Sequence, residues 1–453
     1  MKRPMIINVF EACSPGFMPP GMWQNPEDES FNYLKIEHWS KLAKLLERGR
    51  FDGIFLADIL GNLDIYGGGL AAALPSGMVT PCNDPLMIIP SMAQVTEHLG
   101  FGVTASLSYE PPYLFARKMS TLDHLTNGRI GWNVVTSYLD SAARALGLDR
   151  QLPHEERYRV AEEYMELMYK LWEGSWEDDA VIRDRTSGVY AKPELVHPVV
   201  HHGKYFKLEA IHRCEPSPQR TPIIYQAGSS SKGRGFAAHH GECIFVDTSS
   251  IEKTRGVAED IRRQASELGR DQDSLRIIGG IMVIVGETEA DAQAQLEKHR
   301  KFLLPGGTLA MMSAAMGFDL AAQDPDSPIG AISSEGNLSA VRVLTDSENA
   351  FTPRAVGNHL QGGHGAVIVG TPSSVADEME RWIEEASLDG FNLSQGFRFD
   401  TMERFVDLAV PELQRRGVMQ REYRPGTMRE KIFGKSARLP ASHPADNYRI
   451  KRD

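Results

Sequence analysis

The sequence predicts a β/α barrel of eight strand–helix units, and three observations support that prediction. Short apolar runs alternate with helical patterns along most of the chain. The strands are apolar on both faces, which is typical of a parallel sheet covered by helices. No GxGxxG motif follows the first strand, so an open dinucleotide-binding sheet is disfavoured. Eight units therefore favour a closed barrel.

The order of elements follows from the apolar periodicity. A helical stripe over residues 39–46 is expected to end at Gly49, a typical cap residue. Strands are expected at residues 5–10, 51–57, 101–106, 130–135, 223–226, 243–246, 277–285 and 390–393. Further helices are expected at residues 85–98, 112–125, 155–172, 232–240, 252–268, 289–302, 374–386 and 401–416.

Two stretches interrupt this alternation. Residues 173–222 and 303–365 lack periodicity, so residues 1–416 are interpreted as one barrel domain with two insertions. The second insertion exceeds 50 residues, is rich in Gly, Ser and Met, and is expected to hold an active-site lid. Residues 417–453 form a basic C-terminal extension without a core pattern, expected as an arm over a neighbouring subunit.

Composition excludes several classes of protein. The net charge of −11 disfavours a nucleic-acid partner, which needs a basic surface. No apolar stretch approaches the ~20 residues that cross a bilayer, and residues 1–13 resemble a strand rather than a signal peptide. The four cysteines have no metal-ligand spacing. A cytoplasmic protein with reduced thiols is therefore expected.

Polar residues gather where the predicted strands end. Asp58, Thr104 and the Thr136–Ser137 pair each end an apolar run, and Gly228–Gly233 (GSSSKG) follows another. Ligands of parallel β/α proteins bind at this edge of the sheet. Small residues before a helix N-terminus favour a phosphate, although such a turn is also common without a ligand.

His154 and Tyr158 lie four residues apart at the start of a predicted helix, hence on one face. Both can donate to phosphate or ribityl oxygens, or they can belong to an ordinary helix start. Asp58 can hold a ligand hydroxyl or cap the next segment. Histidines cluster at positions 197, 201, 202 and 212 and at 239–240, but no HxH or HExxH pattern occurs, so no metal site is predicted.

Long strings of the sequence resemble one family. They include FDGIFLAD, GFGVTASLSYEPPYLFARKMSTLDHLTNGRIGWNVVTS, HEERYRVAEEYMELMYKLWEGSWEDD and TPIIYQAGSSSKGRGFAAHHGECIF. The chain resembles the nitrilotriacetate, pristinamycin-synthase and dibenzothiophene-sulfone monooxygenases of the bacterial luciferase-like superfamily over about residues 5–435. It looks nearest to the long-chain alkane and dimethyl sulfide branch, which shares the tail pattern REKIFGKSARLPASHPADNYR.

The resemblance implies a (β/α)8 TIM barrel of luciferase type and a two-component monooxygenase. Its cofactor would be FMN, bound as FMNH2, which a separate NAD(P)H:FMN oxidoreductase supplies. A flavin C4a-hydroperoxide formed with O2 would oxygenate a small organic substrate. The residues implied for flavin binding are Asp58, Thr104, His154, Tyr158, Gly228, Ser229 and Ser230. A homodimer or homotetramer is expected.

The sequence departs from this branch on the substrate side. Ser14 and Phe17 align with the cysteine and histidine that the branch carries after the first strand, and Tyr138 aligns with another histidine. Leu63, Val79 and Met311 also replace polar residues. Apolar and sulfur-containing side chains (Phe17, Met18, Met22, Met311 and Met312) thus favour a small hydrophobic organic or organosulfur substrate over a polycarboxylate. Tyr138 and Ser14 are the candidate catalytic residues.

Three alternatives stay open from sequence. A deazaflavin-dependent dehydrogenase would use the same barrel to transfer hydride. A non-catalytic flavin-binding protein would have lost its chemistry with the polar groups of the pocket. A metal-dependent hydrolase would use the histidine cluster.

Overall fold

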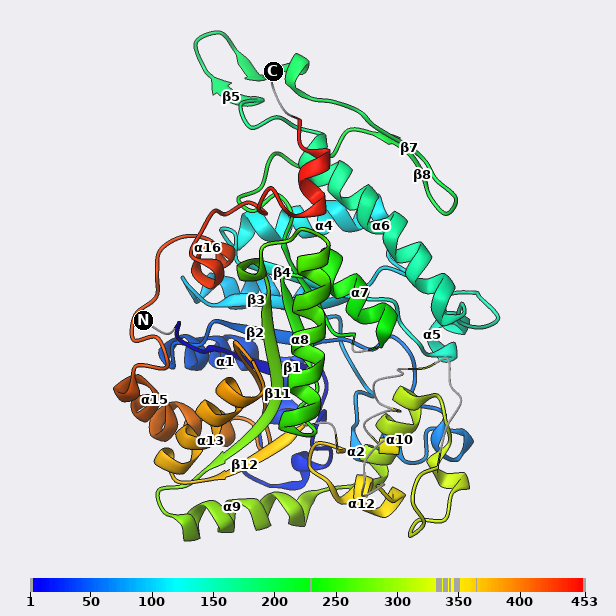
Figure 1. Ribbon diagram of the computed structural model, residues 1–453, viewed down its shortest axis with the longest axis vertical. Helices are drawn as coiled ribbons and strands as arrows, with labels where there is room; N and C mark the ends of the chain where they lie inside the picture. Colours follow the sequence, from blue (N-terminus) through cyan, green and yellow to red (C-terminus); the bar gives the residue numbers. More distant parts are fainter. Residues whose placement is uncertain are drawn as a thin grey trace.

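A closed sheet of eight parallel strands forms the centre of the computed structural model, which describes residues 3–228, 230–330, 336, 341, 344–345, 351–363 and 365–450 (Figure 1). The order around the barrel is β10-β9-β4-β3-β2-β1-β13-β11, and β10 pairs with β11 to close it. The barrel strands are β1 (Ile6–Ala12), β2 (Gly53–Ala57), β3 (Gly100–Ser106), β4 (Ile130–Val135), β9 (Ile223–Gln226), β10 (Cys243–Val246), β11 (Arg276–Val285) and β13 (Gly390–Ser394). The predicted barrel is confirmed.

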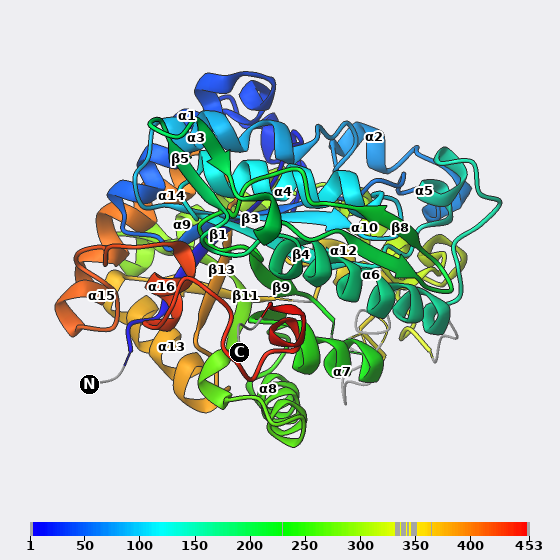
Figure 2. The same ribbon diagram turned by 90° about the horizontal axis from the view of Figure 1, so that it is seen from above.

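Helices surround the strands and bury their apolar faces against them (Figure 2). They are α1 (Ile36–Arg48), α3 (Ile89–Gln94), α4 (Pro112–Leu125), α6 (His154–Gly174), α7 (Ser231–His240), α8 (Ile251–Glu267), α9 (Glu289–Phe302), α13 (Pro372–Glu385), α14 (Asp400–Arg404) and α15 (Val410–Arg416). The helix expected over residues 85–98 is shorter: a 3-10 turn, Pro85–Met87, precedes α3. The helix expected over 401–416 includes a π-helical turn, Phe405–Ala409, between α14 and α15. No described helix is long and apolar enough to cross a membrane.

A ninth strand, β12 (Ala366–Gly370), was not predicted. It pairs in parallel with the second half of β11, from Ile281 to Val285, whereas β13 pairs with residues 278–282 of the same strand. At ten residues, β11 extends beyond β10, which pairs only with its residues 276–279. The backbone groups of β11 beyond that point are paired by β12.

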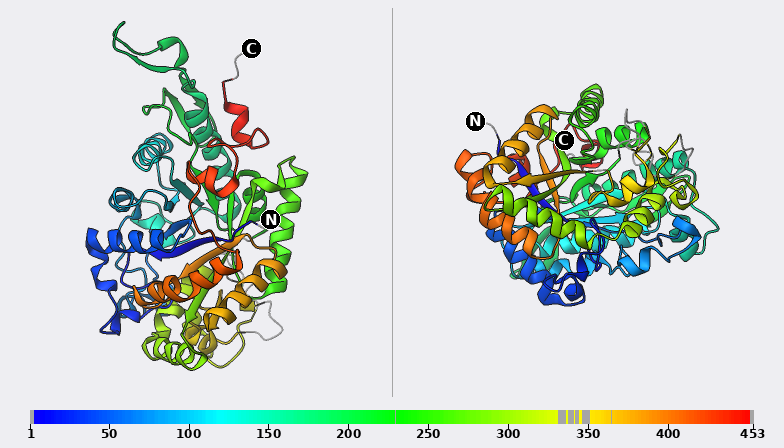
Figure 3. Two further views of the ribbon diagram at one scale, coloured as in Figure 1. Left: turned by 90° about the vertical axis from the view of Figure 1, so that its left-hand side faces the viewer. Right: turned by 90° about the horizontal axis from the view of Figure 1, so that it is seen from below.

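The first insertion projects from the barrel body as two small antiparallel hairpins (Figures 1 and 3). One joins β5 (Val181–Asp184) to β6 (Val189–Ala191), and the other joins β7 (Val199–His202) to β8 (Lys207–Ala210). It extends from the C-terminal end of α6, at the opposite end of the molecule from the second insertion (Figure 1).

The second insertion contains helices rather than a simple loop. They are α10 (Pro305–Met316), a 3-10 turn at Leu320–Ala322 and α12 (Pro353–Asn358). α10 packs against α12 and against the short helix α2 (Ala73–Ser76), near the end of the molecule where β11 ends (Figure 1). Much of the predicted lid, between residues 331 and 350, lies outside the described residues.

The C-terminal extension packs on the chain's own barrel. Helix α16 (Met428–Phe433) buries Met428, Ile432 and Phe433 against side chains from the barrel base. Arg429, in the same helix, is also buried and donates to Glu242 at 2.7 Å. The expectation that the extension lacks a core pattern was wrong for α16, because a helix of six residues is too short to show a period in sequence. Contact of the extension with a neighbouring subunit stays a prediction.

Candidate active site

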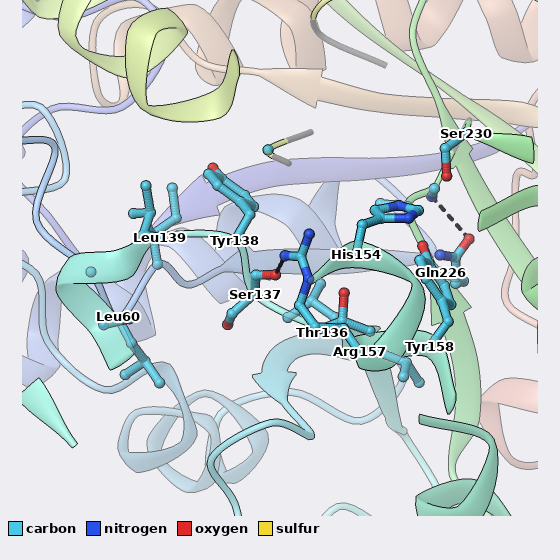
Figure 4. Close-up of a pocket in the computed structure, with 18 of the residues that line it drawn as sticks. Leu60, Thr136, Ser137, Tyr138, Leu139, His154, Arg157, Tyr158, Gln226 and Ser230 are labelled. Carbon is cyan, nitrogen blue, oxygen red and sulfur yellow. Dashed lines mark hydrogen bonds between the residues drawn. The ribbon is translucent and has the colours of Figure 1, made fainter. Parts of the chain in front are cut away.

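A cavity opens where β2, β4 and β9 end (Figure 4). Its volume is about 860 Å³, including the part open to solvent. The described lining comes from the loops after these strands, from α5 (Asp140–Ala145) and from the starts of α6 and α7. The structure thus brings polar groups from several strand ends to one cavity, as the sequence predicted.

The turn between β9 and α7 forms one wall. Ser230 caps α7 by accepting a hydrogen bond from the Gly233 backbone N–H at 3.0 Å, and the Gly228 N–H donates to the Gln226 side chain at 2.9 Å. A Cβ atom at Gly228 would lie 2.5 Å from Gln226 Nε2 and 3.0 Å from the Gly233 Cα. A larger residue would therefore have to shift the Gln226 side chain and press on the Gly233 backbone, whereas glycine lets the backbone approach a ligand closely.

The first turns of α6 face this wall. His154 and Tyr158 lie with ring centroids 5.0 Å apart, and both line the cavity. Burial raises the pKa of Tyr158, and a hydrogen bond with the Ser230 side chain partly offsets that rise. Four predicted residues, His154, Tyr158, Gly228 and Ser230, thus lie together, whereas Ser229 falls outside the described residues.

Arg157 also lines the cavity, and the sequence analysis missed it. It is only 2 % exposed and donates to the Ser137 carbonyl oxygen (Figure 4). Ser137 has a φ of 53°, and its hydroxyl donates to the Ser106 hydroxyl at 2.8 Å. A signal was present: position 157 precedes the apolar positions 161, 164 and 165 by four, seven and eight residues and so shares their buried face.

Asp58 lines the cavity directly after β2. Burial raises the pKa of its carboxyl to about 6, and the negative charge of Asp84 adds to the rise. At pH 7 the folded protein therefore holds a poorly solvated carboxylate at the cavity, which is characteristic of ligand-binding positions.

Two predicted residues are not part of the described lining of this cavity. Thr104 is buried on β3 and accepts a hydrogen bond from the Asn133 side chain at 2.9 Å. Ser14 is completely buried; its hydroxyl donates to the Gly16 carbonyl oxygen at 2.7 Å, and its own carbonyl accepts from Arg398. Their hydrogen bonds here are structural, and their roles with flavin or substrate stay predictions.

Tyr138 forms the side of the cavity opposite α7. Burial raises the pKa of its hydroxyl to about 12, so it stays protonated near neutral pH. It packs against a group of apolar side chains, here called the apolar cluster. The cluster includes the predicted substrate-side residues Phe17, Met18, Leu63, Val79 and Met311 together with Ile59, Tyr109, Leu139, Ala142, Ala310 and Ala314. Met22 and Met312 lie outside this cluster.

The histidines are distributed among separate partners. His197 bonds to Glu177, His201 to Glu163, and His212 to Ser120. Among the described residues, Glu162, His239 and His240 have ligand atoms within 4.8 Å of one another, but none of the three lines the described cavity.

Comparison with known proteins agrees with this architecture. The family model described as luciferase-like monooxygenase matches residues 17–390. The dimethyl-sulfide monooxygenase of Hyphomicrobium sulfonivorans is 46 % identical over 99 % of this chain and 94 % of its own. The long-chain alkane monooxygenase of Geobacillus thermodenitrificans is 45 % identical over 99 % of both chains.

Solved structures match along the whole barrel. A Hyphomicrobium sulfonivorans protein of 45 % identity superposes with a TM-score of 0.92 over 99 % of this chain and 96 % of its own. A riboflavin lyase, solved with modified FMN and riboflavin, has a TM-score of 0.93 at 33 % identity. The match covers 99 % of this chain and 100 % of the lyase chain. The chain therefore belongs to the luciferase-like monooxygenase family and is an enzyme of the monooxygenase class.

Proposed function

We propose that the protein is the oxygenating component of a two-component monooxygenase that uses FMNH2 and O2 to oxygenate a small hydrophobic organic or organosulfur molecule. The observation that carries the proposal is the polar wall at the α6–α7 junction. A helix N-terminus, a serine hydroxyl, a phenol, an imidazole and a guanidinium converge there beside a glycine that leaves room for a ligand.

These groups fit the phosphate and ribityl chain of FMN. The α7 N-terminus, Ser230, Tyr158 and His154 would hold the phosphate end, with Gly228 allowing close backbone approach. Ser229 is proposed for the same end on the family resemblance alone. Arg157 adds positive charge and fixes the loop before Tyr138. Asp58, at the end of β2, and Thr104, deeper in the barrel, are proposed for the ring and ribityl end.

Bound FMN, once reduced, would supply the electrons that activate O2. The chain's own residues would orient the cofactor and exclude water from the reacting atoms. The apolar cluster and α10 serve the exclusion of water. Tyr138 holds its proton at neutral pH and is the proposed polar group on the substrate side; Ser14 is a second, more deeply buried candidate.

The proposal includes a partner and a location. Because no dinucleotide-binding motif occurs, a separate NAD(P)H:FMN oxidoreductase would deliver FMNH2. The cytoplasm, where NAD(P)H is available, is the proposed compartment, and a homodimer or homotetramer is the proposed assembly.

The cofactor proposal is tested by binding. The double variant Ser230→Ala/Tyr158→Phe should weaken the affinity for FMNH2, measured anaerobically by flavin fluorescence, by at least about 10-fold, because two hydrogen bonds to a charged group are lost. Ser250→Ala is the matched control, since Ser250 caps α8 in the same way. Unchanged affinity in the double variant would refute the site.

The reaction is tested by isotope incorporation. With FMNH2 supplied and 18O2 present, one labelled oxygen atom should appear in the product of a hydrophobic substrate. Hydride transfer to a deazaflavin without oxygen consumption would instead favour the dehydrogenase alternative. Flavin binding without oxidation of any tested substrate would favour the non-catalytic one.

A further inference from the structure

The cavity has two chemically different halves. One is the polar wall of α6 and α7 described above. The other is apolar, and its described lining consists of Ile59, Leu60, Tyr138, Leu139 and Ala142. A ligand that spans the cavity therefore meets two environments.

The apolar half continues beyond the cavity. Ile59, Tyr138, Leu139 and Ala142 all belong to the apolar cluster, which extends to side chains from the loop after β1 and from α10. Phe17, in that loop, packs edge-on against Phe10 of β1 with ring centroids 4.9 Å apart. The substrate side is thus backed by non-polar surface drawn from several segments.

The described lining of the apolar half contains no arginine or lysine. Within the described lining of the cavity, Arg157 is the one arginine or lysine, and it already donates to the Ser137 carbonyl. Asp58, also in the lining, is acidic. A carboxylate in the apolar half would lose its hydration without gaining a cation, which is strongly unfavourable.

One polar group remains available in the apolar half. The Tyr138 hydroxyl makes no hydrogen bond to another described residue of the chain, whereas the hydroxyl of Tyr109, in the same cluster, accepts one from Gln151 at 2.6 Å. A phenol hydroxyl at the apolar end of a cavity favours a ligand that accepts a hydrogen bond from it.

We propose that the apolar half binds an uncharged, largely apolar molecule with one strong hydrogen-bond acceptor, a carbonyl or sulfoxide oxygen, and that Tyr138 is the donor to that oxygen. Such an oxygen satisfies the hydroxyl, whereas a thioether sulfur is a weak acceptor and a hydrocarbon is none. The proposal names the substrate class of the proposed function and therefore rests on it.

The test is direct binding to the FMN-saturated and the FMN-free protein by titration calorimetry, so it requires no turnover. The probes are octan-2-one, dibutyl sulfoxide, octane and octanoate. The ketone and sulfoxide should bind about 3- to 10-fold more weakly to Tyr138→Phe than to the wild type. Octane should bind both proteins alike, and octanoate should bind neither.

Tyr109→Phe is the matched control. It removes a hydroxyl from the same cluster, but that hydroxyl already has a hydrogen-bond partner in Gln151. It should leave all four affinities unchanged. Octanoate binding as tightly as the ketone, or an equal loss in both variants, would overturn the proposal. Failure of FMN to bind would refute the proposed function, whereas the effect of Tyr138 would still be measured in the FMN-free protein.

Discussion

The ionised Asp58 carboxylate should lower the free energy of unfolding of the FMN-free protein at neutral pH, and Asp58→Asn should raise it again. Burial and Asp84 raise the pKa of Asp58 from 3.8 to about 6. The folded state therefore binds more protons than the unfolded state between these values, and stability falls as pH rises through that window. A shift of about two units corresponds to about 3 kcal/mol above pH 6.

This change in the free energy of unfolding corresponds to a small change in the melting temperature. The unfolding entropy of a protein of 453 residues is about 1 kcal/mol/K, so Asp58→Asn should raise Tm by about 3 °C at pH 8 and by almost nothing at pH 4. The assay is differential scanning fluorimetry of the FMN-free protein across this range. The difference between variant and wild type is the informative quantity, because burial also raises the pKa of Asp52, to about 7.

A neighbouring variant serves as the control. Asp84 accepts a hydrogen bond from the Leu86 backbone N–H, and asparagine keeps that capping oxygen while removing the charge. Asp84→Asn should therefore shift Tm in the same direction as Asp58→Asn, but by less. An Asp58→Asn difference that is the same at pH 4 and pH 8, or a lower Tm at pH 8, would refute the reasoning.

Three further outcomes are expected. Gly228→Ala should weaken FMN affinity in equilibrium titration, because its Cβ would lie 3.0 Å from the Gly233 Cα and press on the backbone of the turn that faces the ligand. Arg429→Met should destabilise the fold by about 3–5 kcal/mol in denaturant unfolding, because it leaves the Glu242 carboxylate buried without its partner; an unchanged midpoint would contradict this. Arg157→Met should weaken FMN affinity while near-ultraviolet circular dichroism stays native, because it removes both a cation from the cavity and the donor to a backbone carbonyl.

The barrel could be predicted because its signals are local. Each barrel strand is a short apolar run, and parallel strands bring the residues that follow them to one edge. Asp58 and Gly228 were expected at this edge for that reason, and both line the cavity, while their roles with flavin stay predictions. The prediction missed β12 because its place depends on a distant partner: it pairs with the second half of β11, which at ten residues is the longest strand of the barrel.

The end of α1 at Gly49 was predicted correctly, but the reason for a glycine there differs from the one expected. It ends α1, as predicted, but its φ is −76°, and the left-handed residue is Arg50. A Cβ atom at Gly49 would lie 2.6 Å from a methyl group of Val406, so the requirement is close packing against a segment more than 350 residues away. Sequence distance hides such a contact.

The same distinction explains why the family is recognisable while the substrate is not. The proposed cofactor wall is built from two short segments, the start of α6 and the turn before α7, whose residues are neighbours in sequence. The apolar cluster draws Phe17, Leu63, Val79, Tyr138 and Met311 from five separate segments. Each of these is an ordinary side chain in its own segment, and only the closed barrel makes them one surface. A change of substrate therefore requires only scattered substitutions that leave every long motif intact, which is why binding measurements with Tyr138 variants, rather than further comparison of motifs, test the substrate class.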